Sequence, residues 1–219
     1  MKDIIKPAAV LAAVTFCASL LLATVFAVTK ERIAFLDSEA EKNALAIVLP
    51  GYSITGTAKT KDNKIYWVGE KTENGETING FAFISESPGY SGTIRCMIGV
   101  DSNMNILGIS ILKQTETPGL GARSVEIASK NTFWDVITGS AVDEGIQFPW
   151  FQQQFAGLNG NKTVQVVKNG DWTPEMASDL VSQNAVSAIT GATITSKAVV
   201  DCIHKGISEY NDIIKNSNK

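Results

Sequence analysis

The longest run of apolar positions lies near the N-terminus. Residues 8–28 contain no charged side chain, and lysine or arginine flanks them on both sides. A helix needs about 20 apolar residues to cross the hydrocarbon core of a bilayer, so this run predicts a transmembrane anchor over residues 1–29. A signal peptide cleaved after Ala27 is the competing interpretation, but the apolar part of such peptides usually spans only about 7–15 residues.

Apolar positions at helical spacing continue beyond the anchor, at Ile33, Leu36, Ala40 and Ala44. Pro50-Gly51 ends this pattern, because neither residue favours the continuation of a helix. The spacing therefore predicts a helical stalk over residues 30–50, followed by one folded domain over residues 51–219.

From Tyr52 the pattern changes to the two-residue period of β-strands. Apolar runs at Ile65–Val68 and Phe81–Ile84 flank a turn that contains Asn74-Gly75, which is typical of a hairpin. A second hairpin follows, because residues 94–100 and 107–111 each alternate apolar with small or polar positions. This alternation favours an antiparallel sheet with one covered face.

The alternation assigns side chains to faces of the predicted sheet. Cys96 falls on the apolar side and is expected to be a small core residue. Leu107, Ile109 and Ile111 are expected to share one face, because they are two residues apart.

The C-terminal region has the period of an amphipathic helix. Its apolar residues follow at steps of three or four, at Val199, Ile203, Ile207, Tyr210 and Ile214. His204 is expected on the solvated side of this helix. Between the hairpins and this helix we expect a helix over 124–134, a strand over 163–167 and a short helix over 174–181. The fold class is therefore α+β: one N-terminal transmembrane helix and a single domain with an antiparallel sheet and flanking helices.

Composition excludes several classes of function. The net charge is −3 without a concentrated basic run, which argues against a nucleic acid partner. The three cysteines show no CxxC spacing and His204 is the only histidine, so the chain alone is not expected to hold zinc, an iron–sulfur cluster or haem. A disulfide between Cys96 and Cys202 is permitted but not required by the spacing.

A threonine-rich turn stands just before the C-terminal helix. Its sequence from Ser187 to Ser196 is SAITGATITS, with Thr193 next to the predicted helix start. Unpaired backbone N–H groups and the helix dipole favour an anion there, and Gly191 allows a close approach. A turn that only caps the helix would have the same sequence features, because serine and threonine are ordinary N-cap residues.

Two motifs and a shorter patch resemble one known family. Thr190-Gly191-Ala192-Thr193 resembles the flavinylation motif of the FMN-binding domain family, which occurs in the G subunit of Rnf complexes and in the C subunit of the sodium-pumping NADH:quinone oxidoreductase. The segment 116–121 (ETPGLG), with Gly-Tyr-x-Gly-x-Ile upstream at 89–94, resembles the second signature of this family. The aromatic stretch 148–157 resembles a further short patch.

The resemblance implies a set of site residues. FMN would be joined to Thr193 through a phosphoester bond, installed from FAD by a separate magnesium-dependent flavin transferase. The residues that would surround the attachment point are Thr190, Gly191, Ala192 and Thr195. The residues that would wall the flavin are Glu116, Thr117, Gly119, Leu120 and Gly121. Within the aromatic patch, Trp150 is expected nearest the flavin. Ser187 stands where family members usually carry an acidic residue.

The resemblance also implies a function and a location. The chain would relay electrons through covalent FMN as the redox subunit of an ion-translocating oxidoreductase of the Rnf type, which connects ferredoxin and NAD⁺. It would cross the bacterial cytoplasmic membrane once and place its large domain on the extracytoplasmic side. Its partners would be other subunits of the complex, including membrane-embedded flavin and iron–sulfur subunits, and it would not be catalytic alone.

Three alternatives remain at this stage. The chain could be the corresponding subunit of the sodium-translocating NADH:quinone oxidoreductase. It could be an anchored scaffold or sensor domain without a cofactor, for which Ser187 is the one supporting feature. It could also be a soluble FMN-binding reductase released by cleavage after Ala27.

Overall fold

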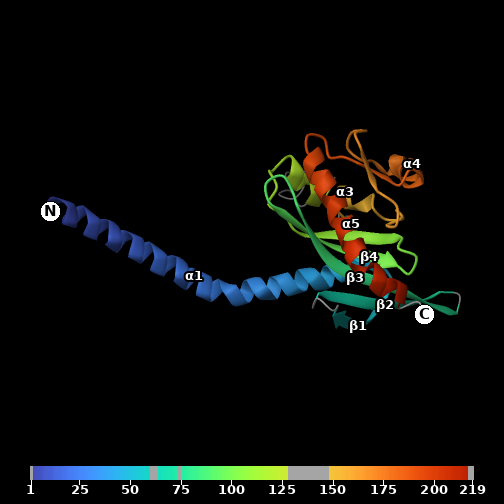
Figure 1. Ribbon diagram of the computed structural model, residues 1–219, viewed down its shortest axis with the longest axis horizontal. Coiled ribbons are helices and arrows are strands. Elements are labelled where there is room, and N and C mark those ends of the chain that lie inside the picture. Colours follow the sequence, from blue (N-terminus) through green and yellow to red (C-terminus); the bar gives the residue numbers. More distant parts are fainter. Residues whose placement is uncertain (1, 60–63, 74, 128–147, 217–219) are drawn as a thin grey trace, which may run out of the picture. The chain divides into compact units, whose positions relative to one another are not determined.

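The computed structural model describes residues 2–59, 64–73, 75–127 and 148–216 (Figure 1). The chain divides into two compact units, Met1–Lys42 and Asn43–Lys219. The α+β fold class is confirmed, because a long apolar helix precedes a domain built from an antiparallel sheet and helices.

Helix α1 (Lys2–Val48) contains both the predicted anchor and most of the predicted stalk. Its span from Ile5 is long and apolar enough to cross a membrane. The most apolar window of this span has a mean hydropathy of 2.4, and none of it is buried against the described part of the chain. The helix ends where the sequence indicated, and Gly51 after it takes a φ of +77°. A positive φ is a conformation that glycine adopts without steric cost.

The domain is built on a five-stranded meander, because the strands pair in chain order and each pair is antiparallel. The strands are β1 (Ser53–Lys59), β2 (Ile65–Glu73), β3 (Glu76–Pro88), β4 (Thr93–Asp101) and β5 (Ile106–Lys113). Both predicted hairpins are confirmed as the pairs β2–β3 and β4–β5. Asn74 of the predicted first turn lies outside the described residues.

Helix α5 (Thr193–Asn216) covers one face of this sheet and packs on β3 and β4 (Figure 1). All five apolar residues that defined its predicted period are buried. The ring of Tyr210 stacks on that of Phe83 with 4.6 Å between centroids. The apolar face of α5 therefore closes the main core of the domain.

The other face of the sheet is also covered, so the prediction of a single covered face was wrong. Val48, in the last turn of α1, packs with Ala82 and Met97. It lies over Gly99 and Gly108, which pair across β4 and β5, and a Cβ at Gly99 would overlap the carbonyl group of Val48. The alternation pattern did not reveal this contact, because glycine forms the docking surface without contributing an apolar side chain.

Leu107 does not share a face with Ile109 and Ile111, which corrects the second expectation for this hairpin. The register between β4 and β5 shifts next to Gly99, and Leu107 is the extra residue of the resulting bulge. Leu107 packs in the cluster beside the end of α1, whereas Ile109 and Ile111 pack in the main core.

Shorter elements complete the domain. They are η1 (Gly121–Val125), α3 (Trp150–Gln153), β6 (Gln165–Val167), η2 (Pro174–Met176), α4 (Ala177–Ser182) and β7 (Ala185–Ser187). The predicted strand corresponds to β6 and the predicted short helix to η2 and α4. The helix expected from Ser124 does not begin there, because Ser124 lies in the 3₁₀ turn η1, and its remainder from residue 128 lies outside the described residues.

The three-residue strand β7 pairs in parallel with β6 and was not predicted from the sequence. The buried side chain of Gln154 holds its last residue from the other side. Gln154 accepts a hydrogen bond from the N–H of Ser187 (2.7 Å) and donates one to its carbonyl oxygen (3.2 Å). These contacts fix the strand that leads into the threonine-rich turn.

His204 and the buried cysteines serve the core. His204 is half-buried and its Nε2 accepts a hydrogen bond of 3.0 Å from the N–H of Val164, so the prediction of a solvated histidine was wrong. Cys96 is buried as expected, and both Cys96 and Cys202 are free thiols. Their mutual hydrogen bond, together with burial, raises the pKa of Cys96 well above its usual value.

Candidate functional site

The threonine-rich turn is held rigidly between β7 and α5. Ala192 donates to the carbonyl oxygen of Ile189 (2.9 Å), which closes the turn. The hydroxyl of Ser196 accepts from the N–H of Ile189 (3.0 Å) and donates to the carbonyl oxygen of Ala192 (3.1 Å). Gly191 takes a φ of +79°, a conformation that favours glycine, and a Cβ there would lie 3.1 Å from the side chain of Leu120.

Thr193 is the first residue of α5 and is half-buried. The N–H of Ser196 bonds to the carbonyl oxygen of Ala192, so the N–H groups of Thr193, Ile194 and Thr195 have no acceptor within the helix. These groups and the helix dipole produce positive potential where an anion can bind.

A buried carboxylate joins this helix start to the predicted second signature. Glu116 is only 6% exposed; its Oε2 accepts a hydrogen bond of 2.6 Å from the hydroxyl of Thr195, and its Oε1 accepts one of 3.1 Å from the N–H of Ser91. A Cβ at Gly121 would lie 2.6 Å from Oε2 of Glu116. The glycine is therefore needed so that the carboxylate can reach α5.

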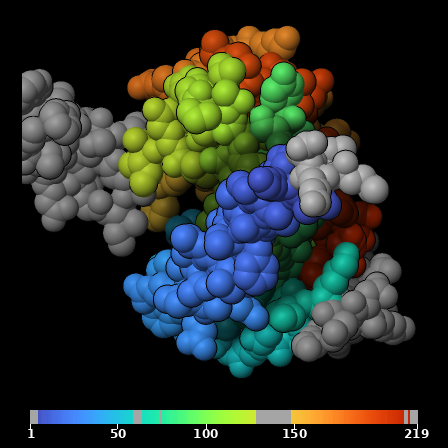
Figure 2. Space-filling model, turned by 90° about the vertical axis from the view of Figure 1, so that its left-hand side faces the viewer, coloured from blue at the N-terminus to red at the C-terminus, as the bar shows by residue number. Residues whose placement is uncertain are grey.

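The two signatures enclose a cavity of about 720 Å³. Figure 2 shows the lime segment that contains residues 116–121 and the orange-red start of α5 gathered at the same end of the domain. The predicted site residues that line the cavity are Glu116, Thr117, Leu120, Gly121, Thr190, Gly191, Ala192, Thr193 and Thr195. Gly119 and Trp150 do not line it; Trp150 is buried in the main core.

Sequence reasoning missed several residues that line the cavity. They are Tyr90, Lys168, Gly170, Ala188, Ile189 and Ile194. A signal existed for Tyr90, which lies inside the quoted Gly-Tyr-x-Gly-x-Ile motif, and for Ala188, Ile189 and Ile194, which lie inside the quoted stretch 187–196. No signal marked Lys168 or Gly170, because the loop after β6 matches no motif and reaches the cavity only through the tertiary fold.

Three large apolar side chains at the cavity are exposed to solvent. Tyr90 is 70% exposed, Ile194 56% and Leu120 44%. Burial of such side chains on a ligand is favourable at roughly 25 cal/mol per Å² of apolar surface. The opening of the cavity is therefore suited to a flat apolar group.

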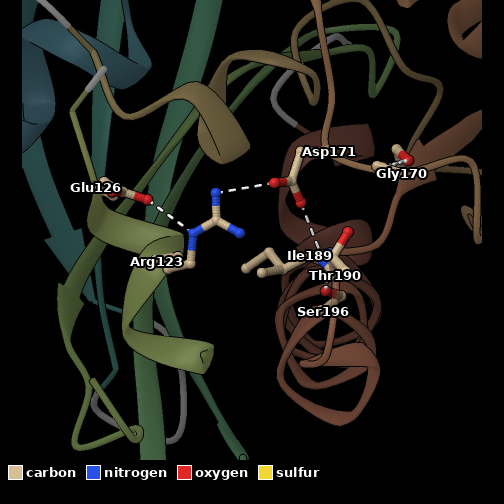
Figure 3. Close-up of polar contacts among 8 residues, drawn as sticks. Arg123, Glu126, Gly170, Asp171, Ile189, Thr190 and Ser196 are labelled. Atoms are coloured by element: carbon tan, nitrogen blue, oxygen red, sulfur yellow. Dashed lines mark hydrogen bonds and ion pairs between the residues drawn. The ribbon is translucent and has the colours of Figure 1, made fainter. Parts of the chain in front are cut away.

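An ion pair lies beside the turn (Figure 3). Asp171 Oδ1 accepts a hydrogen bond of 3.1 Å from the N–H of Thr190, and Asp171 Oδ2 lies 2.9 Å from a guanidinium nitrogen of Arg123. Partial burial raises the pKa of Asp171, but the hydrogen bonds from Thr190 and Arg123 lower it, and the net pKa is below the usual value. The carboxylate is therefore held in its charged form.

No group of three or more histidine, cysteine or acidic residues that could hold a metal ion occurs among the described residues. The described lining of the cavity offers backbone N–H groups, hydroxyls, the Glu116 carboxylate, the Lys168 ammonium group and apolar side chains.

Comparison with known protein families identifies the family of this chain. The family described as FMN-binding domain matches residues 89–208, which is more than half of the chain and includes both cavity walls. The chain belongs to the FMN-binding domain family.

Relatives of this FMN-binding domain protein match along most of its length. It is 28% identical to the G subunit of the ion-translocating oxidoreductase complex of Methanosarcina acetivorans over 94% of both chains. It is 30% identical to the G subunit of the Na⁺-translocating ferredoxin:NAD⁺ oxidoreductase complex of Acetobacterium woodii, over 65% of this chain and 54% of the relative. Its identity to the proton-translocating counterpart of Clostridium ljungdahlii is 25%, over 89% of this chain and 82% of the relative.

Two solved structures are similar at a lower level. The C subunit of the Na⁺-translocating NADH-quinone reductase from Parabacteroides distasonis is 24% identical, with a TM-score of 0.42 over 68% of this chain and 63% of that chain. NqrC of Shewanella oneidensis is 18% identical, with a TM-score of 0.40 over 78% and 73% of the respective chains.

The cavity of this FMN-binding domain fits FMN. The cofactor needs an anion-binding group for its phosphate and an apolar slot with a few polar contacts for its ring. The start of α5 would supply the first, and Leu120 and Tyr90 with the nearby Glu116 and Thr117 would supply the second. The volume of about 720 Å³ also lies in the range of about 300–1,000 Å³ typical of cofactor pockets.

Proposed function

We propose that this chain is the electron-transfer subunit of a membrane-bound ion-translocating oxidoreductase of the Rnf type, with FMN held in the cavity at the start of α5. The observation that carries the proposal is that both walls of this cavity lie inside the FMN-binding domain match. Relatives matched over most of their length are named as the G subunits of ion-translocating complexes. When bound, FMN supplies one- and two-electron transfer, so the chain relays electrons between subunits and has no substrate of its own.

We further infer that FMN is joined covalently to Thr193. Attachment forms a bond between the hydroxyl oxygen of Thr193 and the FMN phosphorus of FAD, breaks the pyrophosphate bond and releases AMP, while the hydroxyl proton passes to the flavin transferase. The half-buried hydroxyl at the first position of α5 supports this choice. A phosphodiester carries one negative charge less than FMN itself, so the helix start and nearby Lys168 suffice to bind it.

The remaining cavity residues orient the ring and limit water. Leu120, Tyr90 and Ile194 are the exposed apolar side chains that can cover it, and the hydroxyl of Thr117 offers a polar contact. Glu116 holds the two walls together through Thr195 and Ser91. We place Tyr90 rather than Trp150 beside the ring, because Tyr90 lines the cavity and Trp150 does not.

The proposed location is the cytoplasmic membrane, crossed once by α1, with the domain on the extracytoplasmic side. The apolar span from Ile5 supports the anchor, and the names of the relatives support partners within a membrane redox complex. Membrane-embedded flavin and iron–sulfur subunits are the expected partners, together with the transferase that loads Thr193. Fusion of alkaline phosphatase to the C-terminus tests the orientation, since this reporter is active only outside the cytoplasm.

The flavin is tested on the full-length chain produced with and without a magnesium-dependent flavin transferase. We expect an ultraviolet-fluorescent band on a denaturing gel and the corresponding mass increase in the intact chain, both dependent on the transferase. Thr193→Val removes the hydroxyl and should abolish both signals, whereas Thr193→Ser keeps a hydroxyl and should retain them. A dark wild-type band in the presence of active transferase would contradict covalent attachment and favour the cofactor-free scaffold.

A further inference from the structure

We propose that Asp171 and Arg123 form an ionic clamp that positions the turn before Thr193, and that Arg123 neutralises Asp171 so that an anion can bind beside it. The role of the clamp toward a flavin phosphate rests on the proposed function. Its role in holding the turn stands on the contacts of the unloaded protein.

The clamp begins at the backbone of Thr190. Within the turn, the N–H of Ile189 donates to the hydroxyl of Ser196, and the N–H of Ala192 donates to the carbonyl oxygen of Ile189. The N–H of Thr190 donates to the carboxylate of Asp171 instead. A carboxylate that accepts a backbone N–H makes a stronger hydrogen bond than a neutral acceptor. Asp171 therefore fixes the turn three residues before the proposed attachment point (Figure 3).

The loop that carries Asp171 is itself tied to the strand before the turn. Ser187 donates its hydroxyl to the carbonyl oxygen of Gly170 (2.6 Å), and the N–H of Ala188 donates to the carbonyl oxygen of Val167 (2.8 Å). Ser187 is fully buried, and its contact with the exposed Gly170 is partly buried. Asp171 is thus presented to Thr190 by a loop that cannot shift without breaking the contacts of β7.

Arg123 closes the clamp from the opposite wall. It lies in η1, directly after the second signature, and contacts Asp171 on one side and Glu126 Oε2 on the other, each at 2.9 Å. Its guanidinium group lies 5.4 Å from the centre of the Trp150 ring. The cation–π contact and the two carboxylates hold the guanidinium group from three sides, and this contact connects η1 with the Asp171 loop and, through Asp171, with the turn.

The charges of the pair explain why two residues are needed. A lone carboxylate at Asp171 would repel a phosphate at the start of α5, and Arg123 offsets one of the two carboxylates that it contacts, Asp171 and Glu126. Loss of Arg123 alone should therefore harm anion binding more than loss of Asp171 alone, although both changes break the same ion pair. Loss of both charges together should restore part of the binding.

The positioning role is tested by hydrogen–deuterium exchange on the full-length unloaded protein. Asp171→Ala removes the acceptor, and we expect about tenfold faster exchange in peptides that cover residues 187–193, as follows from the strength of a charged hydrogen bond. Asp171→Asn keeps an acceptor oxygen and should give a smaller change. Asp179→Ala is the matched control, because it removes an exposed aspartate of the neighbouring helix α4.

The electrostatic role is tested by flavin attachment in the same full-length variants produced with the transferase. Arg123→Gln should reduce the fraction of loaded chain severalfold and Asp171→Asn less, and the double variant should load more flavin than Arg123→Gln, because it removes one of the two carboxylates left without their cation. Peptides from β3 and β4 must keep wild-type exchange, which shows that each variant is folded.

The outcomes separate the clamp from the proposed function. Wild-type exchange in the turn of Asp171→Ala would overturn the positioning role. A double variant that loads no more flavin than Arg123→Gln would overturn the charge argument. If the wild-type chain stays dark, the covalent flavin is rejected, while the exchange comparison still decides whether Asp171 holds the turn.

Discussion

Thr195 and Glu116 are separated by 79 positions in the chain, yet the threonine hydroxyl donates a buried 2.6 Å hydrogen bond to the carboxylate. This contact joins the first turn of α5 to the loop 116–121, and through Ser91 it also reaches the turn between β3 and β4. Both walls of the cavity therefore depend on one carboxylate with two backbone or hydroxyl donors.

The first prediction concerns Thr195→Val. The substitution leaves one oxygen of Glu116 buried without its donor, which should lower the free energy of unfolding by about 1–3 kcal/mol. Denaturant unfolding of the full-length chain in detergent measures this change. Thr117→Val is the control, because Thr117 is exposed and bonds through its hydroxyl only to that of Ser91, at 3.3 Å. Equal losses for the two variants would contradict a special role for the buried pair.

The second prediction concerns the glycines below the end of α1. Gly99→Ala places a methyl group against the carbonyl group of Val48, so the helix end must move and the free energy of unfolding should fall by about 1–3 kcal/mol. Gly56→Ala is the matched control in β1, since nothing lies within 4 Å of its Cβ position. A Gly99→Ala variant as stable as Gly56→Ala would show that the helix end does not dock there.

The third prediction concerns acid. The folded-state pKa of Asp171 is lowered, so its contribution to stability is present above the unfolded value of about 3.9 and is lost as the pH falls through the folded-state pKa. The wild type should therefore lose stability faster than Asp171→Asn as the pH falls below about 4. If the free energy of unfolding has the same pH dependence in the wild type and in Asp171→Asn, the hydrogen bonds from Thr190 and Arg123 do not stabilise the carboxylate.

The fourth prediction concerns where the domain begins. A fragment 43–219 keeps Val48 and Leu49 on the sheet, whereas a fragment 52–219 exposes the cluster around Ala82 and Met97. Loss of two large buried side chains should cost about 1.5–3 kcal/mol each. Gel filtration and denaturant unfolding should show the longer fragment to be monomeric and more stable. Equal behaviour of both fragments would mean that the end of α1 is dispensable.

Elements with a regular apolar period could be predicted from the sequence. The face of α5 and the hairpin strands were found because Val199, Ile203 and Cys96 follow the periods of 3.6 and 2 that burial imposes. The resemblance in the two signatures directed attention to the two walls that enclose the cavity. Local pattern was sufficient in these places because the same residues determine both the element and its burial.

Features that depend on distant partners could not be predicted. The bulge at Leu107 follows from pairing with β4, and the docking of Val48 depends on glycines that carry no pattern. His204 was predicted to be solvated because its acceptor role depends on Val164, which lies in the loop before β6. Asp171 carried no motif either, since its importance comes from the loop that brings it to Thr190.

Helix α5 has its first turn in the cavity and its remaining turns in the main core. Hydrogen exchange in the hydrogen-bonded, buried turns of α5 should therefore follow the slowest, whole-domain opening rather than local fraying. Because the rest of α5 lies in the main core, Thr193 should leave its position only when the domain unfolds. The environment of a flavin bound at Thr193 should therefore stay unchanged up to the unfolding temperature of the domain.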